Sequence, residues 1–258
     1  MSQFDINFPK VLVASPTANA KKYCFEDWLQ NAMNFKYPNY KIMLFDNSID
    51  DGEFVEYMNN HFKENYGEHN DKFLAVKSDI KDKSTWLIER MCVSHNDCSQ
   101  YAINNGFDYL FHLESDIFPP ETIIEDLMCH RKKVCGGLYH IDEGAGRKLM
   151  IQDRIHRAPK DIVMDNISAR REVEFVDGSL KTAGHIGLGC ILISKEVLKK
   201  VPFRFLHWSF TKGIGMHPDV YFAEDCYHKG IPIFVDTSIM CNHQNKSWNL
   251  YVYKKGEH

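Results

Sequence analysis

The chain of 258 residues lacks a charge excess, a long apolar run and a secretory signal. Its 31 Lys and Arg residues nearly balance 35 Asp and Glu residues, which argues against a protein that holds nucleic acid mainly through a basic face. The longest uncharged stretch near the middle of the chain, Thr182–Ser194, is too short to cross a bilayer. The first residues have no basic and apolar signal regions, so a cytoplasmic protein is expected.

Several sequence motifs are also missing. The eight cysteines include no C-x-x-C pair and mostly lie in apolar runs, so reduced, buried thiols are expected rather than disulfides or a zinc cluster. No G-x-G-x-x-G follows the first predicted strand and no G-x-x-x-x-G-K-[ST] occurs, which argues against dinucleotide-binding dehydrogenases and P-loop NTPases. With 44% hydrophobic residues and no repeats, the composition is that of a globular protein.

What the sequence does contain is an alternation of short apolar runs and helical periodicity. Over the first 113 residues, strands and helices are predicted in turn at 10–15, 18–34, 41–45, 54–62, 73–76, 85–104 and 109–113. Further elements are predicted at 121–130, 134–139, 190–194, around 197–198, at 221–229 and at 231–235. This alternation predicts an α/β fold with a mostly parallel sheet flanked by helices, and 141–179 shows too little periodicity for an assignment.

Two acidic residues follow the strand predicted at 109–113. Glu114 and Asp116 are two residues apart, so their side chains could converge on one cation if the strand continues that far. Ligands of open parallel sheets bind beyond the carboxyl ends of the strands, where these acids would lie. A polar loop with an acidic helix cap explains the same residues equally well.

Three further features contain chemically active side chains. Asp46 ends the strand at 41–45, where it could bond a nucleotide base or ribose, or form an Asx turn. Glu224 and Asp225 are adjacent acids near the start of a predicted helix, where a carboxylate can act as a general base or stabilise the helix end. His243 follows the last predicted strand, and a lone histidine is more often structural than a metal ligand.

In their order along the chain, these features resemble the GT-A-type nucleotide-diphosphate-sugar glycosyltransferases, closest to the family 2-like group. The matching segments are Val11–Thr17, Leu44–Ser48, Glu114-Ser-Asp116 as the D-x-D metal motif, Gly184–Ile193 as a small-residue loop, Ala223–Asp225 as the acidic pair, and His243. They span nearly the whole chain. The sequence departs from the family pattern at Glu114, which replaces the first Asp of the motif, and at Asn47, where many relatives have a second Asp.

The resemblance implies a single GT-A domain, with a nucleotide-binding half over about 8–118 and a half that completes the acceptor and metal site over about 119–258. The roles that it implies are nucleotide binding by Pro16, Thr17, Asp46 and Ser115, metal binding by Glu114, Asp116 and His243, and base catalysis by Asp225 with Glu224. The implied metal is Mn²⁺ or Mg²⁺, and the implied donor is a nucleotide-diphosphate sugar, with UDP-sugars favoured.

The reaction that follows from the resemblance is transfer of a sugar to a hydroxyl group with inversion. The acceptor stays open among a glycan, a protein and a modified nucleic acid, such as a hydroxylated DNA base in a phage-like system. In such a system the expected location is the host cytoplasm.

Two other functions fit parts of the sequence. A phosphohydrolase of the haloacid-dehalogenase type would use Asp46 as its nucleophile, but it would require an Asp where Ser48 stands. A GT-A-like binding module would retain the fold without turnover, and the intact acids and histidine argue against it. Exposed aromatic residues could also stack on an acceptor, and core packing is the favoured alternative for each of the candidates, Tyr139, Trp208 and Trp248.

Overall fold

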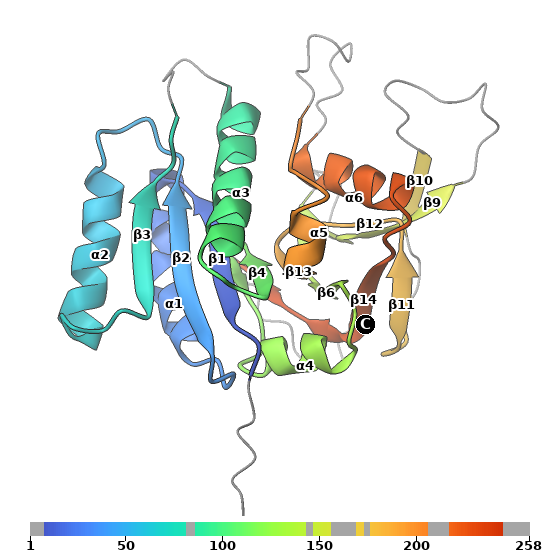
Figure 1. Ribbon diagram of the computed structural model, residues 1–258, viewed down its shortest axis with the longest axis horizontal. Coiled ribbons are helices and arrows are strands. Elements are labelled where there is room, and N and C mark those ends of the chain that lie inside the picture. Colours follow the sequence, from blue (N-terminus) through green and yellow to red (C-terminus); the bar gives the residue numbers. More distant parts are fainter. Residues whose placement is uncertain are drawn as a thin grey trace, which may run out of the picture.

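The computed structural model describes residues 8–80, 86–142, 147–155, 169–172, 176–205 and 217–244. Its centre is an eight-stranded sheet in the order β11-β14-β6-β13-β4-β1-β2-β3 (Figure 1). The strands are β1 (Val11–Thr17), β2 (Tyr40–Asp46), β3 (Phe73–Lys77), β4 (Tyr109–Leu113), β6 (Val134–Leu138), β11 (Leu180–Ala183), β13 (Cys190–Ser194) and β14 (Ile233–Met240).

The sheet is mostly parallel, which confirms the predicted fold class. β1 pairs in parallel with β2 and β4, and β2 pairs in parallel with β3. β14 and β6 are also parallel, whereas β13 runs antiparallel to β4 and β6, and β11 runs antiparallel to β14. The carboxyl ends of β1, β2 and β4 therefore meet at one edge of the sheet.

Helices cover both faces of this sheet (Figure 1). They are η1 (Asn19–Lys21), α1 (Lys22–Met33), α2 (Glu53–Tyr66), α3 (Leu87–Asn104), α4 (Ile123–Cys129), α5 (Lys195–Leu198) and α6 (Pro218–His228). Val11 and Val13 of β1 pack with α1, α2 and α4, whereas Leu12 and Ala14 pack with α3, α5 and α6. A strand buried on both faces needs an unbroken apolar run, as the sequence has there.

Short antiparallel pairs complete the fold. They are β5 (Ile117–Phe118) with β15 (Asn242–His243), β7 (His140–Asp142) with β8 (Arg147–Leu149), and β9 (Ile151–Ile155) with β10 (Ala169–Glu172) and β12 (His185–Ile186). Four of these strands lie partly or wholly in 141–179, where the hydrophobic pattern shows no clear period. Strands this short contain too few residues to establish an alternation, and their partners lie elsewhere in the chain.

Two further expectations can be compared with the structure. All eight cysteines are free, and seven of them are buried while Cys129 is exposed, in keeping with the expectation that most of these thiols are buried. Across the described residues, no helix has the length and apolar character needed to span a membrane.

Candidate functional site

A cavity of about 220 Å³ opens where the carboxyl ends of β1, β2 and β4 meet. Its wall comes from the end of β1, from η1, from the residue after β2, from α3 and from the turn after β4. The lining residues are Pro16, Thr17, Ala18, Ala20, Lys21, Asn47, Leu87, Met91, His95, Glu114, Ser115 and Asp116. Five residues predicted for the site, Pro16, Thr17, Glu114, Ser115 and Asp116, are therefore brought together here.

The two acids after β4 lie in a turn and not on a strand. β4 ends at Leu113, and the Ile117 N–H donates to the Glu114 carbonyl oxygen over 3.0 Å, which closes the turn. The strand therefore does not continue far enough for the two side chains to share one strand face, and the acids lie in a polar turn, the alternative that the sequence left open. The turn is joined to β1 by the hydroxyls of Ser115 and Thr17, whose oxygens lie 3.1 Å apart.

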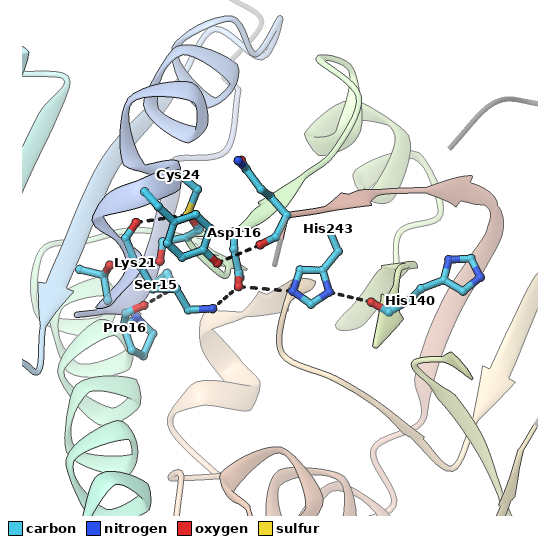
Figure 2. Close-up of polar contacts among 11 residues, drawn as sticks. Ser15, Pro16, Lys21, Cys24, Asp116, His140 and His243 are labelled. Atoms are coloured by element: carbon cyan, nitrogen blue, oxygen red, sulfur yellow. Dashed lines mark hydrogen bonds and ion pairs between the residues drawn. The ribbon is translucent and has the colours of Figure 1, made fainter. Parts of the chain in front are cut away.

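Asp116 faces His243, although the two are far apart in sequence (Figure 2). The antiparallel pairing of β5 with β15 places His243 opposite Ile117, and the Gln244 N–H donates to the Asp116 carbonyl oxygen over 2.8 Å. As a result, Nε2 of His243 lies 3.3 Å from Oδ2 of Asp116. The ammonium group of Lys21, from η1, contacts the same carboxylate oxygen.

The charges of this cluster depend on each other. Burial raises the pKa of Asp116, but the hydrogen bond from His243 and the Lys21 charge outweigh it and lower that pKa below its usual value. Burial lowers the pKa of His243, whereas the bond to Asp116 raises it more. Burial, together with the Asp116 charge, raises the pKa of Glu114 to about 7. Asp116 is thus the firmly ionised carboxylate of the turn.

The donor atoms of Asp116 and His243 suit a divalent cation. Nδ1 of His243 lies 2.7 Å from the His140 carbonyl oxygen, which can only accept, so Nδ1 carries a hydrogen (Figure 2). In the neutral ring the Nε2 lone pair then faces the carboxylate, and a proton or a cation must lie between them. Within the described ranges, no group of three or more His, Cys, Asp or Glu side chains is arranged to hold a metal.

The glycines of the predicted small-residue loop allow Tyr139 to support this pair. A Cβ atom at Gly189 would lie 2.6 Å from the Tyr139 ring, and the Gly189 N–H donates to the Tyr139 hydroxyl over 3.1 Å. The Tyr139 ring packs edge-on against His243 with 6.0 Å between the ring centroids. Tyr139 is buried, so it is a packing residue and not an exposed stacking surface, while Trp208 and Trp248 lie outside the described residues.

Asp46 does not line the cavity. Its Oδ1 accepts from the N–H and the hydroxyl of Ser48 over 3.0 and 2.5 Å, and its Oδ2 accepts from Lys77 over 2.7 Å. The contacts with Ser48 form an Asx turn, and Asp46 is fully buried outside the cavity lining, which argues against its use as a nucleophile in the phosphohydrolase alternative. The next residue, Asn47, lines the cavity instead, and its buried Oδ1 has no hydrogen-bond partner.

The acidic pair of α6 also lies apart from the cavity lining. Because proline is tolerated in a first helical turn, α6 begins at Pro218, and Asp225 is its eighth residue and not near its start. Both oxygens of Asp225 accept from Arg204, over 2.8 and 2.9 Å, and Glu224 is buried.

The acid at the start of α6 is Asp219, which the sequence reasoning missed. Its Oδ2 lies 3.2 Å from Nε2 of His185, and its charge acts on Glu114 and His95, two residues of the cavity wall. Burial raises the pKa of Asp219, but the contact with His185 lowers it to about 2, so the carboxylate is ionised at neutral pH. A proline followed by an acid, as at 218–219, is a helix-start signal that could have identified it.

Comparisons with known proteins give the fold but no close relative. No protein-family model and no curated protein matches the chain. The structure of GalNAc-T7 with UDP, GalNAc and Mn²⁺ aligns with a TM-score of 0.61 and 10% sequence identity, over 95% of this chain and 46% of that one. The fold is of the GT-A type. The crystal structure of A197 from STIV aligns with a TM-score of 0.50 and 16% identity, over 92% of this chain and 86% of that one.

At these identities the likeness shows the GT-A fold alone. The chain spans less than half the length of GalNAc-T7. The reaction, the metal and the acceptor must therefore be argued from the residues of this chain.

Proposed function

We propose that the protein is a metal-dependent glycosyltransferase that moves a sugar from a nucleotide-diphosphate sugar, with UDP-sugars favoured, to a hydroxyl acceptor. The observation that carries the proposal is the contact of Asp116 with His243 beside a cavity at the strand ends of a GT-A fold. The structure of GalNAc-T7 with UDP, GalNAc and Mn²⁺ supports the proposed donor and metal by analogy.

Asp116 and His243 would hold Mn²⁺ or Mg²⁺, and the carboxyl group of Glu114, which lines the same cavity, would lie beside the ion. Such an ion, when bound, supplies Lewis-acid stabilisation of the charge that develops on the diphosphate leaving group. The ammonium of Lys21 adds a positive charge at the same place, where it can bind a phosphate oxygen. Pro16 and Thr17 form the wall available to the nucleoside.

The acceptor hydroxyl must lose its proton as its oxygen bonds to the anomeric carbon and the bond from that carbon to the diphosphate breaks. For the base, the family pattern points to Asp225, and an electrostatic effect on the cavity wall points to Asp219. The charge of Asp219 acts on Glu114 of that wall, while its oxygens contact His185 and the Val220 N–H and those of Asp225 accept from Arg204. We therefore propose Asp219 as the base, with Asp225 positioning Arg204.

Turnover of nucleotide sugars tests the proposal. The protein is incubated with a panel of nucleotide sugars and Mn²⁺, with and without glycan, protein and hydroxylated DNA acceptors, and nucleoside diphosphate release is followed. We expect release from one donor class, we expect EDTA or Asp116→Ala to stop it, and we expect His243→Ala to raise the Mn²⁺ concentration that it requires. An absence of both release and binding for every donor would overturn the transferase, and binding without release would favour the binding module.

A matched control comes from a second Asp and His pair outside the cavity lining. Oδ2 of Asp236 lies 2.7 Å from Nε2 of His130, and Asp236 also accepts from Ser238, so Asp236→Asn removes a similar set of contacts. We expect this variant to retain metal-dependent release. Asp219→Asn should lower kcat measured at saturating acceptor, whereas Asp225→Asn should mainly lower the free energy of unfolding. The reverse result would return the role of the base to Asp225.

A further inference from the structure

Two buried histidines lie in contact between α3 and β4. Nδ1 of His95 lies 2.8 Å from Nε2 of His112, and Nδ1 of His112 lies 2.5 Å from the Leu188 carbonyl oxygen. Both rings are at least 97% buried. Only His95 reaches the cavity wall, where it stands with Met91 and Glu114. The proposed transfer reaction assigns no task to this pair.

The hydrogen bonds fix the position of each ring hydrogen. The Leu188 carbonyl oxygen can only accept, so Nδ1 of His112 donates. In a neutral His112 ring, Nε2 then has a lone pair and accepts from Nδ1 of His95. The hydrogen of a neutral His95 is thereby placed on Nδ1, and its Nε2 keeps a lone pair.

The surroundings of the pair favour neutral rings. No described carboxylate is hydrogen-bonded to either ring, so a positive charge there would be buried without a direct partner. Burial, with a smaller effect of His112, keeps the pKa of His95 well below its usual value, against a weak opposing effect of Asp219.

The orientation of the His95 ring is also fixed. The ring packs against Phe203 with 5.2 Å between centroids and 35° between planes. The backbone of Phe203 is held by Asn96, one residue after His95, whose side chain accepts from the Phe203 N–H over 3.0 Å and donates to the Phe203 carbonyl over 2.8 Å. A ring held on two sides in this way keeps its nitrogen positions without a ligand.

The remaining nitrogen is an acceptor that needs a donor from outside the protein. Among the described contacts, Nε2 of His95 makes no hydrogen bond, while the residue lines the cavity. Glu114 and Asp116, which line the same cavity, offer carboxyl oxygens, so the wall contains several acceptors. A ligand with several hydroxyl groups matches such a wall, because each hydroxyl supplies a hydrogen.

We propose that Nε2 of His95 accepts a hydrogen bond from a sugar hydroxyl of the donor, on its ribose or on the transferred sugar, and that His112 fixes the tautomer that makes this possible. This inference rests on the proposed function. His95 is then a binding residue and His112 a positioning residue. The proposal makes the protein selective for donors that carry the matching hydroxyl.

Binding of deoxy analogues tests the contact. Calorimetry with Mn²⁺ compares UDP, 2′-deoxy-UDP, 3′-deoxy-UDP, the accepted nucleotide sugar and analogues of it that lack single sugar hydroxyls. In the wild type, loss of the one matching hydroxyl should weaken binding about three- to tenfold. The His95→Phe variant should bind the parent ligand more weakly than the wild type does. Its affinities for the parent ligand and for the deoxy analogue should agree within about twofold, because the acceptor nitrogen is gone. If His95→Phe loses discrimination at a ribose hydroxyl, His95 binds the ribose. If it loses discrimination at a hydroxyl of the transferred sugar, His95 binds that sugar.

Nitrogen NMR of the wild type provides a readout that needs no variant to fold. At neutral pH, Nε2 of His95 should give a pyridine-type ¹⁵N signal and Nδ1 a pyrrole-type signal, and addition of the donor should shift the Nε2 signal. A protonated Nε2, or equal discrimination in wild type and His95→Phe, would overturn the inference. If nucleotides bind normally in that case, the proposed function survives, whereas an absence of binding for all nucleotides overturns both.

Discussion

The carboxylates at the ends of β2 and β4 lie at one edge of the sheet, on either side of β1, but their partners differ. Asp46 is held by Ser48, two residues away, and by Lys77 at the end of the neighbouring β3. Asp116 is held by His243, from the far end of the described chain, and by Lys21. Only Asp116 also lines the cavity.

This difference shows how an acid with a structural role differs from an acid of the candidate site, although both follow strand ends at the same edge of the sheet. The Asx turn at Asp46 uses Oδ1, and Lys77 of the neighbouring β3 binds Oδ2, so both contacts stabilise the strand ends and Asp46 does not line the cavity. The partner of Asp116 is an imidazole whose other nitrogen is fixed by the His140 carbonyl. That arrangement is the one by which proteins orient a histidine toward a metal.

The largest effect is expected for Asp116. Asp116→Asn should lower metal-dependent release of nucleoside diphosphate at least about a hundredfold, because it removes a charged ligand and the partner of both Lys21 and His243. Initial rates at saturating Mn²⁺ measure the loss, and Asp236→Asn is the matched control. A variant that keeps a tenth or more of the wild-type rate would place the metal elsewhere.

His243 should have the next largest effect. His243→Ala should raise the Mn²⁺ concentration needed for half-maximal release by about 10- to 100-fold, since one of two protein donors is lost while Asp116 remains. Titration with Mn²⁺ measures the shift, and His130→Ala, which removes the partner of Asp236, serves as control. An unchanged metal requirement with a lower maximal rate would instead make His243 a positioning group.

Sequence periodicity predicted the fold well because β1, β2 and β4 are buried on both faces and the helices between them each bury one face. It also located Glu114 and Asp116 at a strand end. Periodicity failed between 141 and 179, because strands such as β7 and β8 are three residues long and depend on partners elsewhere in the chain.

The roles of individual acids were harder to predict, because a role depends on what a side chain meets in space. The Asx turn of Asp46 with Ser48 is local and was one of the expected alternatives, but nothing local indicates that Lys77 binds the other oxygen of Asp46, or that Arg204 holds Asp225. The pairing of His243 with Asp116 could be expected only from family resemblance. Asp219 was overlooked because the helix was expected to start at 221, three residues too late.

A smaller effect, on stability, is expected at the other strand end. Asp46→Asn should lower the free energy of unfolding by about 2 kcal/mol, because the buried carboxylate accepts charge-assisted bonds from Lys77 and bonds from Ser48. Ser48→Ala should cost about 1 kcal/mol, since it removes only the hydroxyl bond. Urea unfolding measures both, and a larger loss in Ser48→Ala than in Asp46→Asn would contradict the assignment.

The smallest effect concerns Lys77, which also contacts Asp50 over 2.9 Å. Burial raises the pKa of Asp50, but the bonds from Lys77 and the Gly52 N–H lower it below its usual value. Because this folded-state pKa lies below the unfolded value of about 3.9, the ion pair stabilises the fold above that pH, and its contribution is lost as the pH falls through the folded pKa. Lys77→Met should therefore be less stable than the wild type by about 1–2 kcal/mol at neutral pH, because it removes the pair with Asp50 and the bond to Asp46, while the bonds from Ser48 to Asp46 remain.

That difference should shrink below a pH of about 4, as Asp50 takes up its proton and the wild type loses the contribution that the variant already lacks. Urea unfolding of both proteins at neutral and acidic pH measures it. Lys36→Met, which removes an exposed pair with Glu121, should show a smaller difference at neutral pH, since exposed pairs contribute little. A difference in free energy of unfolding between wild type and Lys77→Met that stays constant with pH would mean that Lys77 stabilises β3 by packing and not by charge. The strand end at Asp46 would then be held by its Asx turn alone.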